Sequence, residues 1–303
     1  MSTTAPNISH PAFASFARVL PLTGFSGAAI ALLRDGNGPQ FVRKAAATTA
    51  ANAVLRRQAA RQEWLRRALS DCAKVPEVRG EGEVDGLYYF DMEFVPSRDA
   101  NAFIATAPFD ELAGFADQVE RLMSRLAESR LDDRGPTPSL VPIERKLAEI
   151  AERTAGRFDD LLAPIRSAVE RLGRYAEAPV RTVTHGDLTF ENILVSARGE
   201  LWLIDPIESP IDHYWFDWAK LFQDCEGRWH SHRGKPISLG VSWWLRNRWL
   251  AAAARIAPDY PARHYLLLAL TFARILPYVR SEADEAFVTA RVEAYGEAAL
   301  QHV

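Results

Sequence analysis

The sequence predicts an α+β protein with two lobes, a small N-terminal lobe over residues 1–95 and a larger, mainly helical lobe over residues 96–303. Three observations lead to this prediction. A chain of 303 residues is long enough to bury a large core, and two lobes are the natural expectation. A strong hairpin signal at residues 35–38 separates two short apolar segments, which predicts an antiparallel sheet. After residue 108, apolar residues recur at helical spacing.

The first part of the N-terminal lobe is predicted as a hairpin followed by a helix. Residues 1–15 are polar, and we expect them to be loosely held. Residues 28–33 form the first predicted strand, and residues 41–44 form the returning strand. Residues 53–69 are rich in Arg and Gln and predict the main helix of this lobe.

Two further strands complete the predicted sheet. They cover residues 75–78 and 87–90, and a turn rich in Gly and Glu separates them. The second strand continues into residues 92–95, immediately before Pro96, which is the expected junction of the lobes. The chain after this junction begins the larger lobe.

The larger lobe is predicted to be helical with one interruption. Residues 109–128 predict a long helix, and residues 143–175 predict two helices separated near Pro164. Residues 180–184 predict a strand that leads into a polar motif. The remaining predicted helices cover residues 215–222, 243–256, 265–276 and 283–300.

The polar motif between His185 and Asp205 contains the groups that phosphate-transfer chemistry requires. That chemistry uses a carboxylate to accept a hydroxyl proton, and an amide and a second carboxylate to bind magnesium on the nucleotide phosphates. Asp187, Asn192 and Asp205 supply these groups in that order. Two short apolar segments separated by a turn predict a hairpin that fixes their positions. The alternative interpretation is a buried histidine beside a strand and two surface acids that cap turns.

These residues resemble the aminoglycoside phosphotransferase and choline kinase family, whose members are small-molecule kinases with a protein-kinase-like fold. The resemblance implies that Asp187 is the catalytic base and that Asn192 and Asp205 bind magnesium. It implies that His185 packs beneath the loop and orients it. Asp217 resembles the helix aspartate that hydrogen-bonds the loop backbone, although a first-turn helix acid favoured by the helix dipole is the alternative.

The resemblance also implies a nucleotide-binding role for the N-terminal lobe. Gly24 and Gly27 form a reduced glycine turn that permits close approach of the backbone to phosphate. Lys44 is the candidate that contacts the phosphates, and an exposed strand lysine is the alternative. Glu63 is the available carboxylate that could pair with Lys44. However, the apolar face of the predicted helix is centred near Gln62, so Gln62 could take a weaker hydrogen-bonding role instead.

The expected adenine contacts rest on position alone. In a kinase-like fold, the main chain at the junction of the lobes hydrogen-bonds adenine, which assigns Glu93 and Phe94 to nucleotide binding. Pro206 follows Asp205 where many relatives have an aromatic residue, so it removes a packing side chain and stiffens the loop.

Composition excludes several classes of partner. The net charge is −3 and no concentrated basic stripe is present, which argues against nucleic acid. The longest apolar run near the N-terminus, residues 28–33, is far too short to span a bilayer, so no membrane is expected. Cys72 and Cys225 show neither a disulfide framework nor metal-ligand spacing, so a reducing cytoplasm is the expected compartment.

The acceptor is expected near the loop and the later helices. Glu208, Asp212, Asp224 and Glu226 would suit a cationic acceptor, and neighbouring aromatic residues could stack on a sugar or enclose a quaternary ammonium. Trp229 is the aromatic side chain expected to be exposed there. The alternative is that the acids are solvated and the aromatic residues belong to the core.

The sequence therefore predicts a magnesium-dependent kinase that transfers the γ-phosphoryl group of ATP, with GTP also possible, to a hydroxyl of a small molecule. Sugars, aminoglycosides and choline-like alcohols all fit as acceptors, and the oligomeric state stays open. A pseudokinase or nucleotide-binding scaffold is the alternative from another class. The presence of the base, the metal aspartate and the lysine argues against it. A protein acceptor is a further alternative, but no activation segment is evident.

Overall fold

The computed structural model describes residues 10–22, 27–34, 36, 38–131, 140–173, 181–208, 211 and 213–303. The chain forms two compact units. The first unit contains Met1–Ser97 and Leu194–Ile207, and the second contains Arg98–Ile193 and Glu208–Val303. The division after residue 97 lies two residues from the expected boundary after residue 95. The segment Leu194–Ile207, expected in the C-terminal lobe, is part of the first unit.

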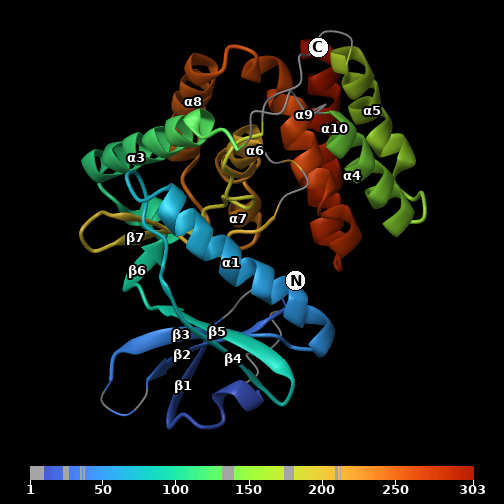
Figure 1. Ribbon diagram of the computed structural model, residues 1–303. Helices are drawn as coiled ribbons and strands as arrows, with labels where there is room; N and C mark the ends of the chain where they lie inside the picture. Colours follow the sequence, from blue (N-terminus) through green and yellow to red (C-terminus); the bar gives the residue numbers. More distant parts are fainter. Residues whose placement is uncertain are drawn as a thin grey trace. The chain divides into compact units, whose positions relative to one another are not determined.

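The first unit is built on an antiparallel sheet whose strands follow the order β1-β2-β3-β5-β4 (Figure 1). Strand β3 pairs with both β2 and β5, so Lys44 lies on a central strand opposite Ile30 and Phe90. The strands are β1 (Arg18–Leu22), β2 (Ala29–Arg34), β3 (Gln40–Ala45), β4 (Val78–Val84) and β5 (Leu87–Glu93). The predicted antiparallel sheet is therefore confirmed.

Two parts of this sheet differ from the sequence prediction. The Gly- and Glu-rich segment predicted as a turn is strand β4, and the turn lies at Asp85 and Gly86, which have φ of 51° and 73°. The strand predicted over residues 75–78 is therefore wrong for its first three residues. Strand β1 was not predicted. Both are edge strands: in β4 the alternating glycines and charged residues weaken the apolar signal, and β1 contains Pro21, which weakens the prediction of a strand.

The helix α1 (Asn52–Ala68) packs on the sheet (Figure 1). Its apolar face contributes Leu55 and Ala59 to a buried cluster that contains Tyr88, Phe90 and Met92 of β5 and nearby residues. The predicted main helix over residues 53–69 is confirmed within a residue at each end. Short 3₁₀ helices cover Pro11–Phe13 and Thr49–Ala51.

The predicted hairpin of the polar motif is formed by β7 (Ile193–Ser196) and β8 (Leu201–Leu203). Gly199, with φ of 74°, lies in the turn, where a left-handed backbone favours glycine. The backbone of Lys74 accepts a hydrogen bond from Leu203 N at 2.8 Å and donates one to Leu201 O at 3.0 Å. These bonds explain why the hairpin belongs to the first unit.

The second unit is mainly helical, as predicted. Helices α9 and α10 pack against each other, and α5 also packs on α10. No helix in the described part of the chain is long and apolar enough to cross a membrane. Its helices are α2 (Ala100–Thr106), α3 (Phe109–Glu128), α4 (Leu140–Arg153), α5 (Asp159–Gly173), α6 (Tyr214–Cys225), α7 (Trp229–His232), α8 (Leu239–Ile256), α9 (Tyr260–Ala273) and α10 (Glu282–His302). Strand β6 covers Ser97–Asp99, and a 3₁₀ helix covers Leu276–Tyr278.

The predicted break near Pro164 is wrong. The chain leaves the helical conformation after α4, where Ala155 and Gly156 have φ of 49° and 73°. Pro164 lies inside α5, and a Cβ added to Gly296 of α10 would lie 3.4 Å from the ring of Pro164. Proline costs one helical hydrogen bond there, yet α5 continues through it to Gly173.

The strand predicted before the polar motif is also wrong in the described residues 181–184. This segment is not a regular strand, and Thr182 forms a single bridge with Arg130. The backbone pairs only briefly with the segment after α3, through Val183 N to Ser129 O at 2.9 Å and Leu131 N to Arg181 O at 3.1 Å. The hydroxyl of Thr182 accepts a hydrogen bond from Tyr214 N at 2.9 Å.

Candidate active site

Helix α6 of the second unit positions the loop that contains the polar motif. Its N-cap is His213, whose Nδ1 accepts a hydrogen bond from Trp215 N at 3.4 Å. Burial, together with the charge of Arg263, lowers the pKa of His213 to about 3. The imidazole is therefore neutral at pH 7 and can accept the capping hydrogen bond.

Asp217, in the first turn of α6, anchors the loop. Its Oδ2 accepts a hydrogen bond from His185 N at 2.7 Å, and its Oδ1 accepts one from Gly186 N at 2.9 Å. The side chain is fully buried, and hydrogen bonds to a buried carboxylate are strong. The role implied by the family resemblance matches this geometry, and Asp217 is also a first-turn helix acid.

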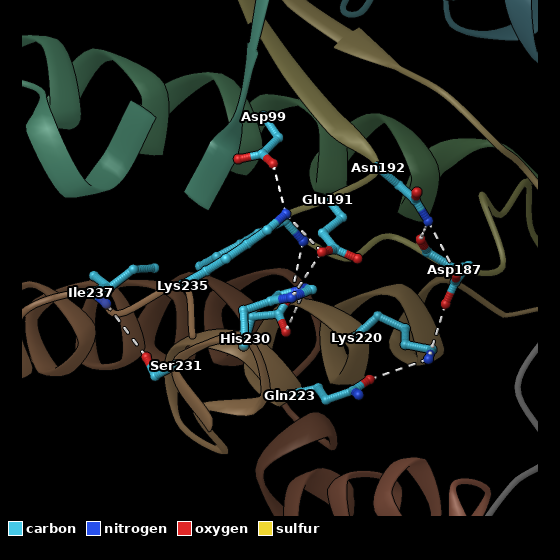
Figure 2. A network of polar contacts seen from close by, with 12 residues as sticks. Asp99, Asp187, Glu191, Asn192, Lys220, Gln223, His230, Ser231, Lys235 and Ile237 are labelled. Carbon is cyan, nitrogen blue, oxygen red and sulfur yellow. Dashed lines mark hydrogen bonds and ion pairs between the residues drawn. The ribbon is translucent and has the colours of Figure 1, made fainter. Parts of the chain in front are cut away.

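Asp187 lies between a lysine and an amide in the second unit (Figure 2). Lys220 Nζ is 2.9 Å from Asp187 Oδ1, and Lys220 also donates to Gln223 Oε1 at 3.2 Å. Asn192 Nδ2 donates to the backbone oxygen of Asp187 at 2.8 Å and to its Oδ2 at 3.0 Å. The side chain of Asp187 is 32% exposed, so it stays accessible to a small molecule.

The charges around Asp187 keep it ionised. Burial alone would raise the pKa of its carboxyl, but the ammonium of Lys220, followed by the charges of His185 and Arg274, lowers it overall. A carboxylate is therefore present at neutral pH, and it can accept a hydrogen bond or a proton from a hydroxyl.

His185 is completely buried, as its predicted packing role requires. Its Nδ1 accepts a hydrogen bond from Asp187 N at 3.3 Å. Sequence reasoning missed Lys220 and Arg274. Lys220 could have been found from its spacing, because it lies one helical turn after Asp217 and therefore on the same face of α6.

Lys44 and Asp205 form an ion pair within the first unit. Lys44 Nζ lies 2.9 Å from Asp205 Oδ1, and the side chain of Lys44 has no exposed surface. The alternative of an exposed strand lysine is therefore excluded. Asp205 has a φ of 55°, an uncommon left-handed conformation for a non-glycine residue that marks a constrained position.

The structure does not pair Lys44 with Glu63. Glu63 accepts hydrogen bonds from Val78 N at 2.8 Å and from Arg66. Burial alone would raise the pKa of Glu63, but these contacts lower it overall. Gln62 occupies the buried face of α1 and donates to Pro76 O at 2.8 Å. The apolar face of α1 therefore packs on the sheet, as its sequence predicts. Glu63 lies beside this buried face rather than on it.

The structure describes three of the other four residues that were predicted to bind the nucleotide. Gly24 lies outside the described residues. Gly27 has a φ of 74°, a conformation that glycine adopts without strain. Glu93 ends β5, and its backbone N–H donates to Glu77 O at 3.0 Å, so that donor is already used within the unit. Phe94 is half-buried and packs against the core of the sheet.

Two of the four acids that were expected to attract a cationic acceptor instead bond to other residues of the protein. Asp224 is buried, accepts a hydrogen bond from Phe190 N at 2.7 Å and lies 3.3 Å from His230 Nε2. Glu226 lies 3.1 Å from Arg246 Nε and 2.9 Å from His264 Nε2. These two acids are therefore not solvated, and internal cations and histidines engage them. Of the other two, Glu208 is exposed and Asp212 lies outside the described residues.

Trp229 is buried, with 7% of its surface exposed, so the expectation of an exposed side chain is wrong. Its ring stacks on His232 and packs against Phe287 of α10. The glycine and charged residues before Trp229 suggested a surface turn. The packing of the short helix α7 against α10 could not be foreseen from local sequence.

A second polar cluster lies beside the loop (Figure 2). Lys235 Nζ is 2.8 Å from Glu191 Oε1 and 3.0 Å from Asp99 Oδ2. His230 Nδ1 lies 3.5 Å from the same oxygen of Glu191. Sequence reasoning did not identify this cluster, which ties the residue preceding Asn192 to the segment after α6.

Known proteins of the same fold are kinases and phosphotransferases. The model of a phosphotransferase enzyme family, APH, matches residues 21–301. The structure of a putative fructosamine-3-kinase from Thermobifida fusca YX-ER1 superposes with a TM-score of 0.61 and 19% identity, over 92% of this chain and 94% of that chain. A GDP and kanamycin complex of APH(2")-IIia gives a TM-score of 0.63 and 16% identity, over 96% of each chain.

A third solved structure, the amicoumacin kinase hAmiN with AMP-PNP, Ca²⁺ and Ami, gives a TM-score of 0.58 and 12% identity, over 92% of this chain and 88% of that chain. A search of curated proteins finds no match. The solved structures confirm the protein-kinase-like fold. Because the family model covers nearly the whole sequence, the chain belongs to the APH phosphotransferase enzyme family.

Proposed function

We propose that this protein transfers the γ-phosphoryl group of ATP to a hydroxyl of a small molecule. The observation that supports this most directly is the Asp187 carboxylate, which Lys220 and Asn192 contact in a loop anchored by Asp217. A carboxylate fixed in this way can orient an acceptor hydroxyl and take its proton. Membership of a phosphotransferase family supports the same reaction class.

Residues of the first unit are proposed to bind the nucleotide. Lys44 would contact the phosphates, because its ammonium is buried on a central strand and already pairs with the carboxylate of Asp205. Gly24 and Gly27 would let the backbone approach the phosphates, and the main chain at Glu93 and Phe94 would face adenine. The complexes of the related folds with GDP and with AMP-PNP support a nucleotide as phosphoryl donor.

Asn192 and Asp205 are the residues proposed to bind magnesium. Asn192 directs its Nδ2 to Asp187, which leaves its carbonyl oxygen as the possible ligand atom. Asp205 contributes a carboxylate with 27% of its side chain exposed. Oxygen ligands of these types are those that Mg²⁺ prefers. The bound ion would neutralise charge on the phosphates during transfer.

Phosphoryl transfer from labelled ATP to a panel of hydroxylated small molecules tests this function. We expect magnesium-dependent transfer to at least one acceptor, and Asp187→Asn should lower turnover by about 10²–10⁴-fold. Asp110→Asn, at an exposed position of α3, is the matched control and should keep full activity. Magnesium-dependent ATP binding without transfer to any acceptor would instead favour a scaffold without chemistry.

A further inference from the structure

The surroundings of Asp187 contain a second cation besides Lys220. Arg274 follows the last residue of α9 as its C-cap, and its guanidinium carbon lies 4.7 Å from the centroid of the Phe216 ring in α6. Arg274 and Asp187 are close enough for the charge of each to influence the pKa of the other. Two cationic groups, Lys220 and Arg274, therefore influence the proposed base, and Asp187 is a single carboxylate.

Arg274 has donors that the protein does not use. Its Nη1 is buried and has no hydrogen-bond partner, and the side chain of Arg274 forms neither a hydrogen bond nor an ion pair with the described residues, whereas its backbone N–H donates to Leu270 O at 3.0 Å. Buried guanidinium groups are normally paired, because desolvation of an unpaired charge is costly. An unsatisfied buried donor of this kind indicates a missing partner, such as a bound anion.

The other groups near Arg274 do not neutralise its positive charge. Glu149 and Tyr278 also lie near Arg274. Glu149 is already paired, with Lys146 Nζ at 2.7 Å and Arg153 Nη1 at 3.7 Å. The hydroxyl of Tyr278 accepts a hydrogen bond from Arg153 Nη1 at 2.7 Å. Among these described residues, four cations face two carboxylates.

We propose that the acceptor is an anionic polyol, with a carboxylate or phosphate group that Arg274 binds while one of its hydroxyls contacts Asp187. This inference rests on the proposed function, because it takes Asp187 as the base. It differs from the expectation of a cationic acceptor, for which two of the four expected acids, Asp224 and Glu226, are engaged internally. The planar guanidinium presents paired N–H donors that match the oxygens of either anion.

The reaction balances without a further reactant. The hydroxyl oxygen of the acceptor forms a bond to the γ-phosphorus of ATP, and the bond from that phosphorus to the bridging oxygen of ADP breaks. The hydroxyl proton passes to the carboxylate of Asp187. Arg274 takes no part in these bond changes and acts on binding and orientation of the acceptor.

Calorimetric titration of the full-length protein, saturated with ADP and magnesium, tests the anion site. The probes are glucuronate, glucose 6-phosphate, glucose and kanamycin, and the two anionic probes distinguish a carboxylate site from a phosphate site. We expect at least one anionic probe to bind tenfold or more tightly than glucose. Arg274→Gln should remove this preference, and Arg274→Lys should retain part of it. Arg166→Gln, on the exposed side of α5, should bind like the unchanged protein.

Equal binding of all four probes, strongest binding of kanamycin, or an unchanged preference in a folded Arg274→Gln variant would overturn the anion site. Circular dichroism checks folding, and Arg274→Lys keeps the test valid if the glutamine variant does not fold. Anion binding through Arg274 without any phosphoryl transfer would preserve the site and count against the proposed kinase function. Transfer to glucose or kanamycin in preference to the anionic probes would preserve that function and overturn the anionic acceptor.

Discussion

Lys220 Nζ lies 2.9 Å from a carboxylate oxygen of Asp187, and Lys220 comes one helical turn after Asp217 on α6. Helix α6 thus contacts the same loop through Asp217, Lys220 and Asp224, whose carboxylate accepts a hydrogen bond from Phe190 N. Asp217 binds the loop backbone at His185 and Gly186, and Lys220 binds the side chain that acts as the proposed base. A rigid helix that holds both the loop and its reactive group limits the orientations available to that group.

Replacement of Lys220 tests whether this contact matters for turnover. In Lys220→Met, the carboxylate of Asp187 loses its ion pair and its fixed orientation, and we expect kcat to fall about 10–100-fold. The KM for ATP should change little, because Lys220 acts through Asp187. Lys220→Arg should recover part of the activity.

Steady-state kinetics provides the measurement, and Lys74→Met is the control because Lys74 forms an exposed ion pair with Glu200 in the first unit. That variant should retain kcat. An equal loss of activity in Lys220→Arg and Lys220→Met, together with a lowered thermal midpoint in both, would indicate a purely structural role for Lys220.

Lys44 and Glu63 form a matched pair of tests for nucleotide binding. Lys44→Met should raise the KM for ATP about tenfold or more, because the buried ammonium that is proposed to contact the phosphates would be lost. Glu63→Gln should change this KM by less than about twofold, because Glu63 bonds Arg66 and Val78 rather than Lys44. A rise of similar size in both variants would show that Glu63 does support Lys44 during turnover.

The local sequence predicted the hairpin that follows the loop better than the side chains that surround the loop. The apolar segments on either side of the turn identified the hairpin, because short turns depend on local order. Lys220 and Arg274 were missed, since their proximity to Asp187 comes from the packing of α6 and α9. Trp229 was misjudged for the same reason, because Phe287, 58 positions later in the chain, packs against its ring.

The boundaries of helices and strands were also predicted well where the local sequence gives a strong signal and poorly where it does not. Helices with a clear apolar face, such as α1 and α3, were predicted almost to the residue. The edge strand β4 was missed because its alternating glutamates and glycines carry a weak strand signal. The break before α5 depends on the left-handed backbone of Ala155 and Gly156, and the prediction placed it at Pro164 although Gly156 is a local signal for the end of a helix.

His230 should make stability depend on pH. Burial lowers the pKa of His230, but the carboxylates of Asp224 and Glu191 raise it overall above 6.5, while Lys235 opposes them. The folded protein therefore holds a proton that the unfolded chain releases near pH 6.5. The stabilisation is complete below that pH and is lost as the pH rises through the higher folded pKa.

Urea unfolding at pH 6 and pH 8 measures this contribution. We expect the free energy of unfolding to fall between these values, and the fall should be smaller in His230→Gln. His302→Gln, at an exposed position near the end of α10, should behave like the unchanged protein. A pH dependence that is identical in His230→Gln and the unchanged protein would show that the carboxylates do not raise the pKa of His230 in the folded state.

Gly227 should tolerate no larger side chain, because the chain passes close to other atoms there. A Cβ added to Gly227 would overlap the ring of Phe272 and lie 2.7 Å from Gln223 O. We expect Gly227→Ala to lower the free energy of unfolding by about 1–3 kcal/mol, the usual range for overpacking. In Gly114→Ala the new Cβ meets open space within α3, so this control should be neutral or stabilising by up to about 1 kcal/mol. Thermal and urea unfolding of both variants separate the two cases, and equal stability of Gly227→Ala and the unchanged protein would mean that Phe272 can move aside at little cost.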